Sequence, residues 1–164
     1  MSGPRHVTRY DVMPIPPVEA HTEWFEAGAL AIGVEYRLVD EAVAAARQVE
    51  AAVLDDRGVS LHVVGDVDGV RREVLRFDCF VEDPHYHYVS WRAKANEVLH
   101  VDPVADGDPL AWALERLRTR LPQMLARAGA PELAAAVDAA VIAAALPRVA
   151  EAAARLRRAA EGAR

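Results

Sequence analysis

Residues 59–91 read VSLHVVGDVDGVRREVLRFDCFVEDPHYHYVSW, and this stretch carries most of the information about the fold. Residues 59–65 and 70–80 are rich in β-branched and aromatic side chains, which favours strands. The DVDG between them ends in Asp-Gly, two residue types that readily adopt the positive φ of a tight turn. Pro84 then interrupts the chain before HYHYVSW. The stretch therefore predicts two consecutive hairpins.

Four side chains of the second hairpin can converge on one face. Successive side chains of a strand point to opposite faces, so Arg76 and Asp78 share one face of the first arm. His85 and His87 share one face of the second arm, and a suitable register would bring all four together. The side chains assigned to the apolar side are Phe77, Cys79, Tyr86 and Tyr88. The Cys79 thiol is accordingly expected to be buried and inert.

The rest of the chain adds strands and helices around these hairpins. An alternating pattern over residues 30–38 predicts another strand, and residues 97–101 a short last one. Strong helix formers over residues 40–54, and leucines at helical spacing over residues 108–128, predict two helices.

The C-terminal part is alanine-rich and is expected to form a long helix over residues 131–162, which Pro147 would kink or split. We therefore predict an α+β fold: an antiparallel sheet of about four or five strands, with helices on one face and this helix packed alongside or across a dimer. Residues 1–20 are expected to be an extended, poorly ordered arm because of their prolines. Residues 21–129 would form the core, and residues 130–164 a helical segment of the same domain.

Composition limits the classes of function. A formal net charge of −6 argues against a protein whose whole surface binds nucleic acid. Residues 108–164 nevertheless carry nine Arg against six Asp or Glu, so a polyanion would meet the helical end. No apolar run approaches the roughly 20 residues that cross a bilayer, and no secretory leader is recognised. With a single cysteine, a cytoplasmic protein without membrane contact is expected.

Metal binding is one interpretation of the polar hairpin face. Asp78, His85 and His87 would make a set of two histidines and one carboxylate. The spacing resembles the cupin metal motif only in its His-x-His, because a tryptophan and an arginine stand where that motif expects a glutamate. Arg76 on the same face would repel a cation. A site without metal or another cofactor is therefore preferred.

A metal-independent phosphodiester reaction makes use of the arginine. One of His85 and His87 would act as general base and the other as general acid, with Asp78 orienting them. Arg76 would hold a phosphate or its transition state through the planar guanidinium.

Three further arginines, Arg116, Arg120 and Arg127, lie on one face of their predicted helix. Arg116 and Arg120 would extend a basic track that binds RNA or a small anionic substrate. A solvated helix face is the competing interpretation.

The order of these elements resembles the small TumE-family toxins of bacterial toxin–antitoxin pairs, which carry an Arg-aromatic-Asp segment and then His-x-His on the next strand. The matching residues are Arg76, Phe77, Asp78, His85 and His87. The resemblance covers residues 59–125 and implies a cytoplasmic toxin that acts on RNA and has a helix-turn-helix antitoxin as partner. Cys79 departs from the family's usual asparagine. The chain also resembles uncharacterised bacterial domain families with this hairpin, so a shared fold is expected before a shared activity.

A noncatalytic interaction protein is the alternative, and the sequence leaves open whether the protein is an enzyme. The small side chains of residues 131–162 permit close helix contact, either in a homodimer or with a partner helix. Burial of this helix inside the monomer would explain the same composition.

Overall fold

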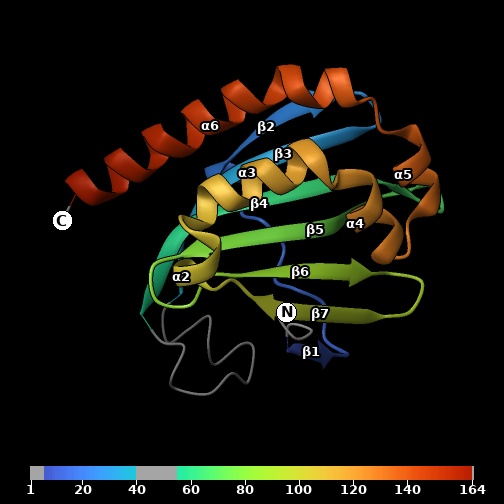
Figure 1. Cartoon of the computed structure of the whole chain (residues 1–164), viewed down its shortest axis with the longest axis horizontal. Helices are drawn as coiled ribbons and strands as arrows, with labels where there is room; N and C mark the ends of the chain where they lie inside the picture. The colour runs from blue at the N-terminus through green and yellow to red at the C-terminus, as the bar shows by residue number, and fades with distance from the viewer. Residues whose placement is uncertain (1–5, 40–54, 164) are drawn as a thin grey trace.

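The structure is a computed structural model that describes residues 6–39 and 55–163 (Figure 1). Its framework is an antiparallel sheet of seven strands in the order β1-β7-β6-β5-β4-β3-β2. The strands are β1 Val7–Tyr10, β2 Thr22–Ala27, β3 Leu30–Val39, β4 Asp56–Val67, β5 Val70–Phe80, β6 His85–Ser90 and β7 Ala95–His100. The predicted α+β class is confirmed, but the prediction of four or five strands is wrong.

The two edge strands account for the difference in strand number. β1 pairs with β7 at one edge, and β2 pairs with β3 at the other. Both strands are mostly exposed or half-buried, so neither has the apolar alternation that marks a strand with one buried face. The arm that the sequence predicts to be poorly ordered therefore contains a strand.

Both predicted hairpins are present. β4 and β5 are joined by Asp68 and Gly69, whose φ values of 53° and 82° suit the two-residue turn. β5 and β6 are joined by residues 81–84, and their register places Asp78 opposite His85.

A β-bulge between β4 and β5 changes which side chains share a face. Val63 pairs with Leu75 whereas Val64 pairs with Glu73, so Val74 is the extra residue. Strict alternation would place Val74 beside Arg76, but Val74 is buried in the apolar core. Glu73 instead bonds to Arg76 and joins the polar face.

The helices cover one face of the sheet (Figure 1). They are α2 Pro103–Asp106, α3 Pro109–Thr119, α4 Leu121–Arg127, α5 Pro131–Ala136 and α6 Ala139–Gly162, and a short 3-10 turn, η1, spans Glu19–His21. The single helix predicted over residues 108–128 is broken at Arg120, and Asp138 caps a new helix within residues 131–162. Pro147 lies inside α6 without ending it. The helix predicted over residues 40–54 lies outside the described residues.

The core lies between the helices and the apolar face of the sheet. Leu61, Leu75 and Phe77 from the strands pack with Leu117 and Leu125 from the helices. Cys79 is buried as predicted, and burial raises the pKa of its thiol. Among the described helices, none combines the length and apolar character that crossing a bilayer requires. The other face of the sheet carries the polar residues that form the candidate site.

Candidate functional site

The face of the sheet opposite the helices contains a buried group of polar side chains. They are Glu35, Ser60, His62, Arg76, Asp78, His87 and Asn96, each 4% exposed or less. Burying charged and polar groups is costly unless each one is paired. A concentration of such groups is therefore a candidate functional site.

Residues 11–18, which we call the N-terminal strap, cross this polar face. The carbonyl of Ile15 accepts a hydrogen bond from Arg76 at 2.5 Å, and that of Val12 accepts one from Asn96 at 3.3 Å. The amide of Val18 donates to Glu35 at 3.1 Å. The strap thus supplies polar partners to three strands, in addition to leading into the sheet.

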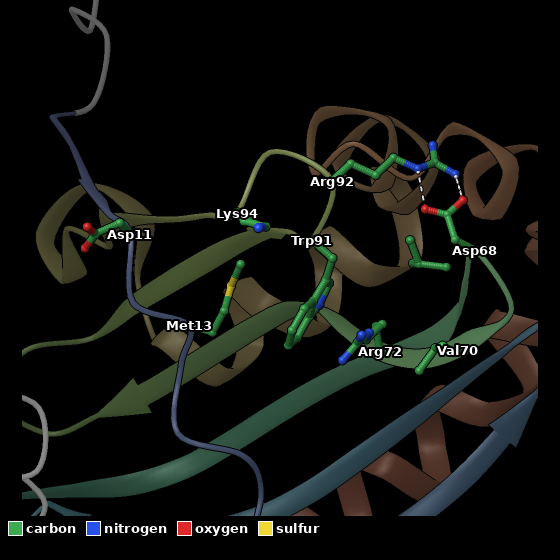
Figure 2. Close-up of a pocket in the computed structure, with 9 residues that line it drawn as sticks. Asp11, Met13, Asp68, Val70, Arg72, Trp91, Arg92 and Lys94 are labelled. Atoms are coloured by element: carbon green, nitrogen blue, oxygen red, sulfur yellow. Dashed lines mark hydrogen bonds and ion pairs between the residues drawn. The ribbon is translucent and has the colours of Figure 1, made fainter.

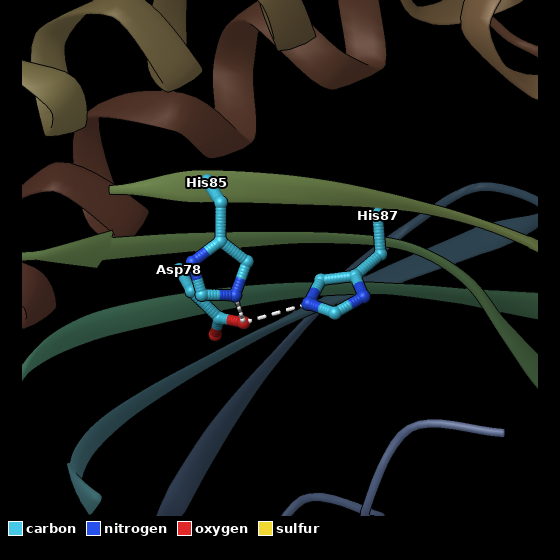
Figure 3. A group of neighbouring side chains, drawn as sticks. All are labelled: Asp78, His85 and His87. Carbon is cyan, nitrogen blue, oxygen red and sulfur yellow. Dashed lines mark hydrogen bonds and ion pairs between the residues drawn. The ribbon is translucent and has the colours of Figure 1, made fainter. Parts of the chain in front are cut away.

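Asp78, His85 and His87 form a compact trio at one end of the β5–β6 hairpin (Figure 3). Asp78 lies directly opposite His85, whereas His87 lies diagonally from it, and both positions are within reach in an antiparallel pair. The Nε2 atoms of His85 and His87 each lie 3.0 Å from Oδ2 of Asp78. The structure therefore brings together three of the four predicted catalytic residues around one oxygen.

A second set of contacts holds the trio in place. Nδ1 of His85 lies 2.8 Å from the carbonyl oxygen of Asp83, and Nδ1 of His87 lies 2.9 Å from Oδ1 of Asn96. These oxygens only accept hydrogen bonds, so each Nδ1 carries a hydrogen. Ser60 donates to the other Asp78 oxygen, Oδ1, at 2.5 Å. Both Nε2 atoms are therefore directed at Oδ2 of Asp78.

The environment shifts the pKa values within the trio in different directions. Burial alone would raise the pKa of Asp78, but hydrogen bonds from His85 and His87 hold it well below its ordinary value. Burial alone would lower the pKa of His85, but Asp78 raises it overall. Burial lowers the pKa of His87, and the charges of His85 and Arg76 lower it further despite the bond to Asp78. The two histidines therefore differ in their tendency to hold a second proton.

Asp56 fixes the loop that precedes His85. This buried carboxylate on β4 accepts backbone hydrogen bonds from Glu82 at 2.9 Å and from Asp83 at 2.8 Å. Because the Asp83 carbonyl orients His85, Asp56 acts on the trio through the loop. The sequence analysis missed this residue, since its partners lie 26 and 27 residues away.

Arg76, the fourth predicted catalytic residue, belongs to a neighbouring cluster. Its guanidinium Nη2 lies 2.7 Å from Glu73, and it also bonds to Ile15 of the strap. His62 bonds to Glu73 through Nδ1 and to Glu35 through Nε2, the latter at 2.9 Å. Side-chain alternation along the strands could have assigned Glu35 and His62 to the polar face. It could not have assigned Glu73, because the bulge shifts this residue to the other face.

Arg116 and Arg120 lie on the opposite side of the sheet from the trio. They line a cavity with Tyr86 and Tyr88, which face the helices. They therefore form no track that leads to the hairpin histidines, because Tyr86 and Tyr88 alternate with His85 and His87 along the strand and point to the other face. Binding of an anionic substrate by Arg116 and Arg120 stays a prediction.

A larger cavity of about 510 Å³ lies at the far end of the hairpins (Figure 2). Trp91 lines it, with the guanidinium carbon of Arg72 at 4.2 Å from the ring centroid. Arg92 is held by Asp68 at 2.9 Å and by Glu132 at 3.1 Å. No residue of the trio lines either of these two cavities.

A protein-family model described as a domain of unknown function, DUF7700, matches residues 24–153. The matched range includes the trio and Arg116, Arg120 and Arg127, whereas β1 and the N-terminal strap precede it. No curated protein and no solved structure matches the chain. A function must therefore be argued from the geometry.

Proposed function

Because the chain belongs to DUF7700, a family of domains of unknown function, we propose from its geometry that it binds a divalent transition-metal ion through Asp78, His85 and His87. The ion would lie between the two Nε2 atoms and the Asp78 carboxylate. Two histidines and one carboxylate form the ligand set of many zinc and non-haem iron sites.

The observation that carries the proposal is the orientation of the two imidazoles. Each Nδ1–H is held by a carbonyl oxygen, from Asp83 or from Asn96. A neutral imidazole with its hydrogen on Nδ1 turns its Nε2 lone pair toward the same carboxylate oxygen. This is unfavourable unless a second proton or a metal ion lies between the two atoms. Histidine ligands of metals characteristically donate their second ring N–H to a carbonyl or carboxylate in this way.

The dimensions of the trio also suit a metal ion. Ligand atoms about 2.0–2.2 Å from an ion at neighbouring coordination positions are separated by about 3.0–3.5 Å, and Asp78 Oδ2 lies 3.0 Å from each Nε2. The side chain of His85 is 13% exposed, against 5% for Asp78 and 5% for His87. An ion can therefore enter from the His85 side.

The repulsion expected from Arg76 is offset in this arrangement. Glu73 pairs with Arg76 at 2.7 Å and compensates most of its charge. Asp78 keeps its negative charge, and a bound cation would take the place of the second proton that Asp78 favours on His85.

The test is metal titration of the full chain after removal of bound metal with a chelator. We expect one equivalent of Zn²⁺ or Co²⁺ to bind and to raise the melting temperature. Asp78→Asn and His87→Gln should weaken binding by about 100-fold or more, since each removes one of three ligands. His21→Gln, which changes an exposed histidine of η1, is the matched control and should bind like the wild type. Metal uptake below about a tenth of an equivalent contradicts the proposal, as does a loss of metal affinity in His21→Gln equal to that in the ligand variants.

The second candidate function is the metal-independent phosphodiester reaction predicted from the sequence. It is supported by the opposite pKa shifts of His85 and His87, which suit an acid and a base. In the same preparations, RNA cleavage that survives chelation but is lost in a His85→Ala/His87→Ala variant would favour this reaction over metal binding. Intact RNA and unaffected growth of expressing cells would count against the toxin resemblance and its antitoxin partner.

A further inference from the structure

A second cavity, of about 260 Å³, lies between the helix-facing side of β6 and helices α3 and α4. Its walls include the aromatic residues Tyr86, Tyr88 and Trp112 and the arginines Arg116, Arg120 and Arg127. The ring centroids of Tyr86 and Trp112 lie 5.0 Å apart. This cavity is separated from the Asp78, His85 and His87 trio by the sheet itself.

The charge of this cavity is positive and only partly compensated. None of its lining residues is a carboxylate. Arg127 pairs with Glu97 at 3.2 Å, outside the lining, while the described residues provide no ion pair to Arg116 or Arg120. Three guanidinium groups around one small space favour an anionic occupant.

One atom of the cavity independently lacks its partner. Nε of Arg116 is buried and is the single buried side-chain nitrogen or oxygen among the described residues that has no hydrogen-bond partner. Buried donors are nearly always satisfied, by protein, water or ligand. An oxygen of a bound anion would supply the missing acceptor.

The aromatic walls of the cavity orient two of its arginines. The guanidinium carbon of Arg127 lies 4.0 Å from the Tyr88 ring centroid, and that of Arg116 lies 5.5 Å from the Trp112 centroid. Stacking on aromatic faces holds a guanidinium in a fixed plane, which favours bidentate binding of a phosphate. The volume is slightly below the roughly 300 Å³ at which ligand pockets usually begin, so the occupant must be small.

We propose that this cavity binds a small aromatic phosphate monoester, with Arg116, Arg120 and Arg127 around the phosphate and the ring against the aromatic walls. A phosphate monoester offers three terminal oxygens and a charge of about −1.5 to −2 at neutral pH, which matches three guanidinium groups better than a carboxylate does. The site requires no metal and does not depend on the trio.

The test is titration of the full chain with phenyl phosphate at low ionic strength, followed by tryptophan fluorescence and by calorimetry. We expect saturable 1:1 binding, weaker binding of inorganic phosphate, and none of phenol. Arg116→Gln and Arg120→Gln should each weaken binding by about tenfold or more. Arg118→Gln is the matched control, because Arg118 lies on the same helix α3 but pairs with Glu115 on the exposed side.

Two results would overturn the proposal. One is the absence of saturable binding up to about 10 mM phenyl phosphate, a concentration well beyond a millimolar dissociation constant. The other is a loss of phenyl phosphate affinity in Arg118→Gln that equals the loss in Arg116→Gln. Such a result would indicate attraction to the basic helical surface without a defined site. Melting curves establish that each variant is folded, and Asp78→Asn should leave phenyl phosphate binding unchanged, so this test is independent of metal binding.

Discussion

Asp78 is the residue on which the candidate metal site depends. It accepts one hydrogen bond from Ser60 on β4, and its Oδ2 lies 3.0 Å from the Nε2 atoms of His85 and His87 on β6. Because its pKa is held well below the ordinary value, it is ionised throughout the physiological range. Its partners therefore determine whether protons or a metal ion balance its charge.

Asn96 gives a specific test of this arrangement, because its one hydrogen bond to the trio is with Nδ1 of His87. Asn96→Ala should weaken Zn²⁺ binding by about 10–100-fold, the usual effect of removing a group that orients a metal-bound histidine. The stoichiometry should remain one, since all three ligands are retained. Competition with a chromogenic chelator measures the affinity.

The control for Asn96 is Glu97→Gln, which alters the next residue of β7 and the opposite face of the sheet. This variant should keep the wild-type Zn²⁺ affinity. An Asn96→Ala protein with wild-type affinity would mean that the orientation of His87 has no influence on metal binding.

Among the elements, strand β5 has the largest effect on the polar face because of its bulge. The bulge places Glu73 beside Arg76 and His62, where it bonds to both side chains. The N-terminal strap then covers this cluster through the Ile15 carbonyl. Removing the directly bonded counter-charge of a buried charged group is strongly destabilising.

Glu73→Ala should therefore lower the free energy of unfolding by about 3–5 kcal/mol, because it leaves the buried Arg76 guanidinium without its directly bonded counter-charge. Urea denaturation measures this change. The double variant Glu73→Leu/Arg76→Met should recover most of the loss, since replacing a whole buried ion pair is often nearly neutral.

Glu26→Ala is the comparison for Glu73→Ala, because Glu26 pairs with Arg71 at 3.7 Å on the exposed surface. Such exposed pairs contribute about 0–1 kcal/mol. If Glu73→Ala costs no more than Glu26→Ala, the cluster is not the buried, mutually dependent unit described above.

Helix α6 buries its apolar stripe within the monomer. Ile142, Leu146 and Val149 are covered, and α6 packs on β2, β3 and α3. The homodimer or partner helix suggested by the alanine-rich composition stays a prediction. Light scattering of the purified chain would measure the oligomeric state.

The stability of the folded chain should depend on pH through His62 and its two glutamates. Burial alone would lower the pKa of His62, but the hydrogen bonds that His62 donates to Glu35 and Glu73 raise it above 6.5. Its stabilising contribution is therefore complete below pH 6.5 and is lost as pH rises through the folded pKa. The pKa values of Glu35 and Glu73 are lowered from 4.5 in spite of burial, so their contributions are present above pH 4.5 and are lost in acid.

We expect the cluster to stabilise the protein most between pH 4.5 and 6.5. The free energy of unfolding of the wild type and of His62→Gln would be measured in urea from pH 5 to pH 9. The wild type should be the more stable protein, and its advantage should be larger at pH 5 than at pH 9. His21→Gln should follow the wild-type profile. If the difference in unfolding free energy between wild type and His62→Gln does not change with pH, the proposed role of His62 protonation is refuted.

Several features of this protein could be determined from the sequence because they depend on neighbouring residues. The Asp-Gly turn, the β5–β6 hairpin and the shared face of Asp78, His85 and His87 follow from turn chemistry and from side-chain alternation. These local rules are sufficient to place two histidines opposite a carboxylate.

The remaining features were decided by the tertiary structure. The bulge moved Glu73 to the polar face, the edge strands increased the sheet to seven, and the N-terminal strap covered side chains that the alternation would have left exposed. Arg116 and Arg120 lie behind the sheet because the helices pack on its apolar face. Each of these outcomes depends on contacts between residues far apart in the chain, and alternation within one strand carries no information about them.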